Sequence, residues 1–456
     1  MAEFKIFQEE RPWGNFRQFT YNSLSTVKII LVKKGEAFSL QYHNDRREFW
    51  RILSGNPEVT VGEKTVIAKT GDEFEVLPKI NHRISSTDSD SEILASTAIR
   101  RRGGKIIKKS KAKVTKKSKS LSNLKRSNKN PIIKPEANVY WESKAVFNPS
   151  AIYHDGKVHV IYRAIGDSDI SVFGYTESRD GFNFDKSSKK LAYYSKGKQA
   201  VKKEIDPKIL YSSGGGWGGG CEDPRLTLLG DKVYMIYTLF DGWGSLRIAL
   251  TSISLNDFIN KRFNWKEPAL ISPPGEIHKN WVLFPEKIKG KYAIMHSFSP
   301  KILIDYFNSL DELDGKKFIR SNNSRPVDNT RTWDSWFRGV GPSPIKTKYG
   351  WLIIYHAMDH KNPDRYRIGA MILDTKDPAK VLYRSNEPIL EPEKLYENEG
   401  YKSGVIYSCG AVVNKKGELF VYYGGADKVS CVATANLDKF LKELITNKVP
   451  KINKKK

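Results

Sequence analysis

Residues 222–240 read "EDPRLTLLGDKVYMIYTLF" and hold two runs of alternating apolar residues on either side of a glycine. Alternation with a period of two is typical of β-strands, and Gly230 predicts a tight turn between them. Glu222, Asp223 and Arg225 stand at the start of the first predicted strand, which is otherwise built for burial. The stretch therefore predicts a β-hairpin that presents charged residues at one end.

The same pattern of strand, glycine turn and second apolar strand occurs five times in the chain. The turn glycines are Gly156, Gly230, Gly290, Gly350 and Gly417, roughly 60 to 75 residues apart. This spacing is about the length of one four-stranded blade with its loops. Residues 136–446 are therefore predicted to form a five-bladed β-propeller.

Corresponding positions of the blades face the central axis of a propeller, so polar residues there are expected to converge. The candidates are Asn148, Asp223, Lys279, His356 and Asp427. Core packing explains such a set poorly, because buried charges without partners are costly. Two structural alternatives stay open: Glu222 and Arg225 form an ion pair between blades, and Asp427 caps a turn. The aromatic candidates are expected either to pack between blades or to stack on sugar rings; they are Trp333, Trp336, Trp351 and Tyr423.

Residues 1–100 show short alternating segments with glycine turns and no helical period, which predicts a small antiparallel β-barrel. The whole chain is therefore expected to be all-β. Gln41 and His43 are two residues apart and face the same side of a strand, and Glu48 and His82 follow. These four residues are the candidate ligands of a metal site suited to Zn, Mn or Fe. Histidines that serve only the structure of the barrel are the alternative.

A strongly basic segment separates the two parts. Residues 100–129 hold 14 Lys or Arg and no Asp or Glu, which is more than half of the net charge of +26. The segment has no aromatic residue to bury or to stack on bases, so residues 101–135 are predicted to be a disordered linker. Binding of nucleic acid or anionic lipid is the less favoured alternative. Residues 447–456 are predicted to be a basic tail.

Three cysteines, Cys221, Cys409 and Cys431, show no metal-ligand spacing and cannot all pair. No apolar run approaches the 18 residues of a membrane span, and the first residues lack a signal-peptide core. The protein is therefore expected in the cytoplasm, with no membrane partner.

Within residues 5–97, "RPWG", "SLQYHNDRREFW", "ILSG" and "LPKINHRI" resemble the cupin domain of type II mannose-6-phosphate isomerases. The resemblance implies that Gln41, His43, Glu48 and His82 hold a metal, and that Arg46 lies near a sugar phosphate. Asn44, Asp45 and Phe49 depart from the usual motif, so a regulatory or sugar-binding cupin is as plausible as an active isomerase.

From about residue 140 to 443, the chain resembles glycoside hydrolase family 130, mostly inverting β-mannoside phosphorylases on five-bladed propellers. The motifs are "NPSAIYHDGKVHVIYRA", "EDPRLTLL", "HKNWVLFPEK", "GVGPSPIKTKYGWLIIYHAMD" and "YSCGAVVNKKGELFVYYGGAD". The resemblance implies that Asp223 is the proton donor, acting through the 3-hydroxyl of the sugar. The residues implied to hold the mannoside are Asn148, Ser150, Arg163 and Asp427. Arg225 is a further candidate for substrate contact, with the ion pair to Glu222 as its alternative.

A phosphorylase needs no base to activate water, because phosphate is already an anion; it needs cations to hold that anion. The resemblance assigns phosphate to Lys279, His356 and Tyr366, with Arg262 or Lys266 as a further cation. The sequence thus favours an enzyme that cleaves a β-mannoside oligosaccharide with inorganic phosphate to give α-mannose 1-phosphate. The alternatives are a β-mannosidase that uses water and a mannoside-binding protein without activity.

Overall fold

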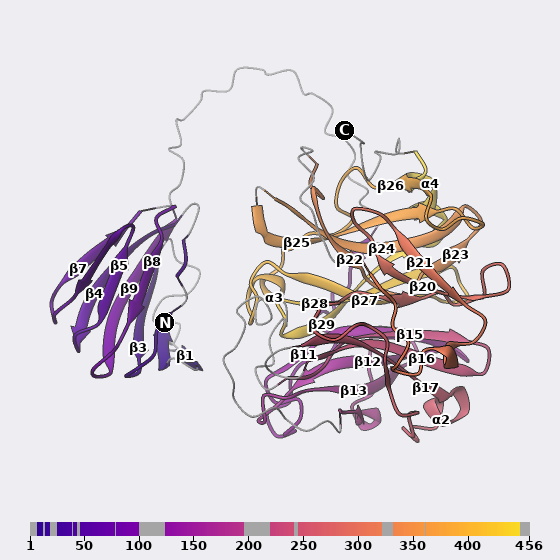
Figure 1. Ribbon diagram of the computed structural model, residues 1–456, viewed down its shortest axis with the longest axis horizontal. Coiled ribbons are helices and arrows are strands. Elements are labelled where there is room, and N and C mark those ends of the chain that lie inside the picture. The colour runs from indigo at the N-terminus through magenta and orange to yellow at the C-terminus, as the bar shows by residue number, and fades with distance from the viewer. Residues whose placement is uncertain are drawn as a thin grey trace, which may run out of the picture. The chain divides into compact units, whose positions relative to one another are not determined.

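The computed structural model describes residues 7–11, 14–18, 25–38, 40–42, 46–77, 79–99, 124–195, 219–240, 245–321, 332–360 and 362–446. The chain divides into two compact units, Met1–Thr115 and Lys116–Lys456. Both units are built almost wholly of antiparallel strands (Figure 1), which confirms the all-β prediction. Within the described ranges, no helix has the length and apolar character that a membrane span requires.

The first unit is a pair of antiparallel sheets around a small core, as expected for a cupin. Its larger sheet has the order β1(Phe7–Arg11), β2(Gly14–Gln18), β3(Ser25–Val32), β9(Ser91–Ile99), β4(Arg46–Ser54), β7(Glu73–Val76). The smaller has the order β6(Lys64–Ile67), β5(Glu58–Val61), β8(His82–Ser85). In β4, Glu48, Trp50 and Ile52 are buried while the residues between them are exposed, so the predicted alternation places one face in the core.

The second unit contains five groups of strands that form the blades of a propeller. Blade 1 consists of β11(Ala145–His154), β12(Lys157–Ile165), β13(Ser171–Ser178) and β14(Lys190–Tyr193). Blade 2 consists of β15(Gly220–Leu229), β16(Lys232–Phe240), β17(Leu246–Ser254) and β18(Ala269–Leu270). Blade 3 consists of β19(Val282–Leu283), β20(Tyr292–Ser297) and β21(Leu303–Phe307). All five turn glycines have positive φ, between 64° and 137°, as the repeat predicted.

Blades 4 and 5 complete the propeller. Blade 4 consists of β22(Trp336–Val340), β23(Ile345–Thr347), β24(Gly350–Asp359), β25(Asn362–Leu373) and β26(Val381–Arg384). Blade 5 consists of β27(Ile406–Val413), β28(Glu418–Gly425) and β29(Val429–Asn436), and β10(Lys125–Arg126) is its outer strand. The short helices are α2(Leu255–Ile259), α3(Leu395–Asn398) and α4(Leu437–Leu444), with 3₁₀ turns at Lys186–Ser188 and Leu310–Glu312.

Strand β10 closes the propeller with residues that were predicted to belong to the linker. It pairs antiparallel with β29, and Ile132 and Ile133 bond to the backbone of Ser430. Arg126 adds an ion pair to Glu397 at 2.7 Å, and Glu397 is fully buried. The predicted linker boundary at residue 135 is therefore wrong, because residues 124–133 supply the last strand of the last blade. Blade 5 is thus made from two ends of the propeller sequence.

Candidate functional site

The charged end of the β15 hairpin is formed by a bulge in the first strand of blade 2. The pairing of β15 with β16 shifts between Glu222 and Arg225, and Asp223 has a φ of +52°. The first strand of blade 1 has the same irregularity around Asn148, whose φ is +48°. A proline follows each residue and cannot donate to the ladder, which favours a bulge at this point. The "NP" and "DP" of the repeats therefore turn equivalent side chains away from the normal pleat.

Asp223 belongs to a closed ring of four charges, three of them buried and the fourth, Lys279, partly buried. Arg163 on β12 lies 2.9 Å from Oε1 of Glu222 and 3.4 Å from Oδ1 of Asp223. Lys279, which precedes β19, lies 2.8 Å from Oε2 of Glu222 and 3.5 Å from Oδ2 of Asp223. Each carboxylate thus faces both cations, which offsets the cost of burying these charges. Side chains from three blades meet here.

The electrostatics of the ring keep Asp223 ionised. Burial alone raises the pKa of Asp223, but the charges of Lys279, Arg163 and Arg225 and the bond from Asn148 lower it below its usual range. Nδ2 of Asn148 donates that bond to Oδ1 of Asp223 at 2.8 Å. A carboxylate in this state has to acquire a proton before it can act as an acid.

Asp427 behaves in the opposite way. It lies in the turn between β28 and β29 with a φ of +53°, and it is almost completely buried. Burial raises the pKa of Asp427 from 3.8 to about 6, and the charges of Lys402 and Arg163 oppose the increase. The two carboxyl groups of the site therefore titrate in different pH ranges.

Arg225 joins four blades and does not pair with Glu222, so the alternative of an ion pair between those two residues does not hold. Its guanidinium donates to the carbonyl oxygens of Gly341 and Asp223 and to Oδ1 of Asn280. It also donates to the hydroxyl of Tyr407 on β27. Arg225 is fully buried, and these partners occupy its nitrogen atoms. It therefore holds the surrounding segments of the site in place.

Two further predicted sugar contacts also have partners within the protein. The hydroxyl of Ser150 accepts a bond from the backbone N–H of Leu226 at 2.8 Å and ties blade 1 to blade 2. Arg163 is fully buried and donates to Ser171 in addition to its ion pairs. Among the described residues, Oδ1 of Asn148 has no hydrogen-bond partner, so Asn148 retains an acceptor for a ligand.

His356 and Asp427 do not occupy the blade position that was predicted for them. His356 lies on the second strand of blade 4, and Asp427 lies in a turn after the second strand of blade 5. Nε2 of His356 accepts the N–H of Ser408, and the ring stacks on Tyr407 at 4.0 Å. Burial lowers the pKa of His356 to about 3, so the ring is neutral and its proton is on Nδ1. No described residue accepts a hydrogen bond from Nδ1.

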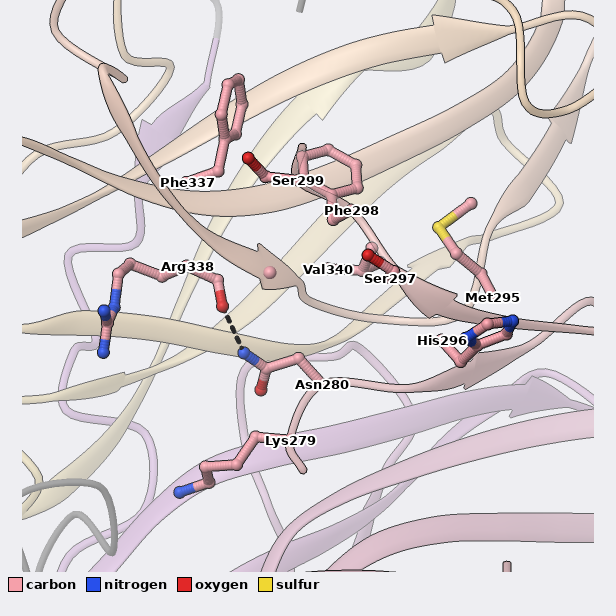
Figure 2. A pocket seen from close by; sticks show the side chains of 11 residues that line it. Lys279, Asn280, Met295, His296, Ser297, Phe298, Ser299, Phe337, Arg338 and Val340 are labelled. Atoms are coloured by element: carbon pink, nitrogen blue, oxygen red, sulfur yellow. Dashed lines mark hydrogen bonds between the residues drawn. The ribbon is translucent and has the colours of Figure 1, made fainter. Parts of the chain in front are cut away.

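A cavity of about 30 Å³ opens beside the ring of charges, between blades 3 and 4. The described residues that line it include two cations, Lys279 and Arg338, and no carboxylate. Figure 2 shows both side chains extending toward the same side of the view, with His296 on the opposite side. Asn280 donates to the carbonyl of Arg338 at 2.7 Å and joins the two segments. The lining favours an anion.

Arg338 was missed by the sequence reasoning, and the structure places it next to a predicted phosphate ligand. Its Nε donates to the hydroxyl of Tyr366 at 2.7 Å, and its guanidinium stacks on Trp336. Within the described part of the chain, no carboxylate pairs with Arg338. "WFRGV" is the first strand of blade 4 and has a bulge at the same place as "NPS" and "EDPR" in blades 1 and 2. An alignment of the first strands of the repeats was therefore the signal that could have pointed to Arg338.

Arg262 and Lys266 are not part of this cluster. Arg262 pairs with Asp257 and Lys266 with Asp311, both as exposed ion pairs. The N–H of Lys266 bonds to Ser252, near the end of β17 that lies away from the ring of charges. The structure therefore does not bring either predicted phosphate ligand to the cavity, whereas Arg338 lines it.

Most of the candidate aromatic residues pack within the protein. Trp351 is buried against Phe284, and Tyr423 is buried and donates to Glu397. Trp333 stacks on Tyr355. The packing alternative therefore holds for these three residues, whereas Trp336 stacks on Arg338 at the site.

The comparisons with known proteins agree with this geometry. Residues 123–445 match the glycoside hydrolase family 130 model, described as β-1,4-mannooligosaccharide phosphorylase. A 1,2-β-oligomannan phosphorylase of Thermoanaerobacter sp. (strain X514) is 40% identical over 321 residues, which cover 68% of this chain and 96% of that protein. The chain belongs to glycoside hydrolase family 130. The resemblance inferred from the motifs is thereby confirmed.

A solved phosphorylase structure has the same fold. The β-1,2-mannobiose phosphorylase from Listeria innocua, in complex with β-1,2-mannobiose, has a TM-score of 0.54 and 24% identity. The match covers 71% of this chain and 100% of that chain. The five-bladed architecture predicted from the repeats is confirmed.

The first unit has a separate match. Residues 3–90 match the model of the mannose-6-phosphate isomerase C-terminal domain. Mannose-1-phosphate guanylyltransferase 2 of Escherichia coli O157:H7 is 39% identical over 66 residues, 14% of this chain and 14% of that protein. The predicted cupin resemblance is confirmed, and the chain spans only a small part of that relative.

The structure brings together two of the four candidate metal ligands. Gln41 and His82 are paired by backbone hydrogen bonds in both directions, and Glu48 is buried beside Trp50. His43 lies outside the described residues. Nδ1 of His82 contacts the carbonyl of Ile80 at 2.8 Å, which leaves Nε2 as the atom suited to a metal. No group of three or more His, Cys, Asp or Glu with metal-site geometry occurs among the described residues, which exclude His43.

Proposed function

We propose that this family 130 chain is an inverting β-mannoside phosphorylase that converts a β-mannooligosaccharide and inorganic phosphate into α-mannose 1-phosphate and a shortened acceptor. The observation that carries the proposal is the cavity whose described lining contains two cations and no carboxylate. One of these cations, Lys279, also lies 3.5 Å from Asp223. A hydrolase needs a base for water at this place, whereas an anionic nucleophile needs cations. Lys279 and Arg338 supply them.

The proposed residue roles combine the family resemblance with the contacts around Asp223 and the cavity. Asp223 gives its proton to the leaving oxygen through the 3-hydroxyl of the mannose, while Asn148 and Asp427 hold that ring. Phosphate is held by Lys279 and Arg338, with Tyr366 and Nδ1–H of His356 as neutral donors. The C1–oxygen bond breaks with its electron pair on the leaving oxygen as a phosphate oxygen bonds to C1. Preorganised cations stabilise the charge that develops between them.

We propose a β-1,2 linkage in the substrate, because the relative at 40% identity is named as a 1,2-β-oligomannan phosphorylase. The test supplies β-1,2- and β-1,4-mannobiose with and without phosphate and identifies the products. Phosphate-dependent release of mannose 1-phosphate from the β-1,2 compound is the expected result. Free mannose released regardless of phosphate would identify a β-mannosidase and contradict the proposal.

We propose that the cupin binds Zn or Mn through Gln41, His43, Glu48 and His82. The contact of His82 with Ile80 fixes the ring so that Nε2 faces a ligand. A bound metal would polarise oxygen atoms of a mannose phosphate. Metal analysis of the purified protein, with isomerase assays on mannose 6-phosphate, tests binding and activity separately; a full-length chain that retains no metal contradicts the site. The three cysteines are free thiols in the structure, which supports a cytoplasmic location.

A further inference from the structure

Lys279 belongs to two parts of the site at once. Its ammonium lies 2.8 Å from Glu222 and 3.5 Å from Oδ2 of Asp223, and its side chain lines the cavity beside Arg338. An anion in the cavity and the carboxylate of Asp223 therefore compete for the same positive charge. Occupation of the cavity necessarily changes the electrostatic environment of Asp223.

Without a ligand, the charges around Asp223 are closely balanced. The cations that face it are Arg163 from β12, Arg225 from β15 and Lys279 from the segment before β19. The carboxylates are Glu222 and, from the turn after β28, Asp427. The other titratable neighbours are His356, Tyr407 and Cys409, all buried. A phosphate dianion adds two negative charges to this buried group, and uptake of a proton reduces the cost.

Three carboxyl groups compete for that proton: Glu222, Asp223 and Asp427, whose pKa is raised by burial to about 6. Burial raises the pKa of Glu222, although Arg163 and Lys279 oppose the increase. Both oxygens of Glu222, however, accept charged contacts of 2.9 and 2.8 Å. Asp223 has longer contacts with its cations, 3.4 and 3.5 Å. Its ionised form therefore loses more electrostatic stabilisation than that of Glu222 when Lys279 turns toward an anion. Among the neighbouring cations, Lys279 also lowers the pKa of Asp223 most and that of Asp427 least, so its movement toward an anion favours proton uptake at Asp223.

We propose that phosphate binding beside Lys279 draws one proton from solvent onto Asp223, so that the acid is loaded only when the nucleophile is in place. This inference rests on the roles of Asp223 and Lys279 in the proposed function. In each turnover Asp223 passes one proton to the leaving oxygen and becomes ionised. Binding of the next phosphate draws another proton from solvent onto Asp223. Water in the cavity carries no charge and leaves Asp223 ionised, which suppresses hydrolysis.

Sulfate is the probe for this coupling, since it stays a dianion between pH 6 and 8 and cannot itself exchange a proton there. The full-length protein in weak buffer is titrated with sodium sulfate, and proton uptake is read from a pH indicator. The expected result is uptake approaching one proton per chain at saturation. Sodium chloride at the same ionic strength is the control and is expected to cause no uptake.

Two variants identify the group that takes up the proton. Asp223→Asn is expected to bind sulfate, measured as thermal stabilisation, and to take up no proton. Glu222→Gln removes one competing carboxylate and leaves Asp223 in place, so uptake is expected to persist. Uptake that is retained in Asp223→Asn overturns the proposal, as does a wild-type chain that takes up no proton at any sulfate concentration.

The product assay separates this inference from the proposed function. A chain that releases mannose 1-phosphate but shows no sulfate-linked uptake is a phosphorylase without the coupling. A chain that shows the uptake through Asp223 but releases only free mannose retains the coupling, and the proposed function is then wrong.

Discussion

At the scale of single residues, the site is defined by which charges have partners. Glu222, Asp223, Arg163 and Lys279 neutralise one another, while Arg338 lines the cavity, stacks on Trp336 and has no carboxylate partner among the described residues. An arginine without a carboxylate partner is well suited to a doubly charged oxyanion. The family motif singled out Asp223 as the proposed acid, whereas Arg338 could be recognised only from its surroundings.

Replacement of Arg338 by alanine should weaken phosphate binding. Loss of a charge-assisted contact of about 1.5–3 kcal/mol corresponds to a rise of roughly 10- to 100-fold in the KM for phosphate. Arg262→Ala is the matched control, because the Arg262 side chain is exposed and pairs with Asp257 on the surface. Initial rates measured against phosphate concentration give the KM for phosphate of both variants. An effect of Arg262→Ala that equals that of Arg338→Ala would restore the original assignment.

The raised pKa of Asp427 predicts that the folding stability of the protein depends on pH. Its folded pKa of about 6 is above the ordinary value of 3.8, so the folded state binds the proton more tightly. The resulting stabilisation is complete below pH 4 and is lost as the pH rises through 6, on the order of 3 kcal/mol at ~1.4 kcal/mol per pKa unit. Denaturant unfolding of wild type and Asp427→Asn from pH 4 to 8 measures it. The difference in unfolding free energy should fall over this range; a constant difference contradicts the shift.

At the scale of elements, closure of the propeller depends on β10 and Arg126. The guanidinium of Arg126 contacts Glu393 as well as the buried Glu397, which also accepts the hydroxyl of Tyr423. Residues 126 and 397 are 271 positions apart. The blade strands were predictable because each hairpin is a local pattern, but a two-residue strand inside a basic segment carries no such pattern.

Arg126→Ala is expected to destabilise the second unit by about 3 kcal/mol, because it leaves the buried carboxylate of Glu397 without its cation. Lys348→Ala removes an ion pair to Asp438 in which both side chains are exposed, and no measurable change is expected. Chemical denaturation monitored by tryptophan fluorescence compares the two variants. Equal effects would mean that Arg126 does not hold the last blade closed.

At the scale of the whole molecule, the chain combines a family 130 propeller with a cupin whose curated matches belong to mannose phosphate metabolism. The two units divide near residue 115, and the family model begins at residue 123. The propeller therefore has its own core and its own site, and β10 lies within the range that the family model matches.

Two truncations test this boundary. A chain that begins at residue 124 keeps β10 and is expected to fold and to retain activity on β-mannosides. A chain that begins at residue 136 lacks β10 and the pairing with Ser430, which exposes the edge of β29, and it is expected to aggregate. Size-exclusion chromatography and activity distinguish them. A stable, active chain from residue 136 would show that the closing strand is dispensable.

The sequence by itself determined the five blades and the family and singled out Asp223 as the candidate acid. Hairpin alternation, turn glycines and the "EDPR" motif are all local patterns. The sequence also placed the cupin from its motifs. Only the tertiary structure decided that Lys279 lies between Glu222 and Asp223, that Arg338 replaces Arg262 or Lys266 beside the cavity, and that β10 closes the last blade. The physical reason is that bulges redirect side chains and that these contacts join distant segments, 57 positions apart for Lys279 and Glu222.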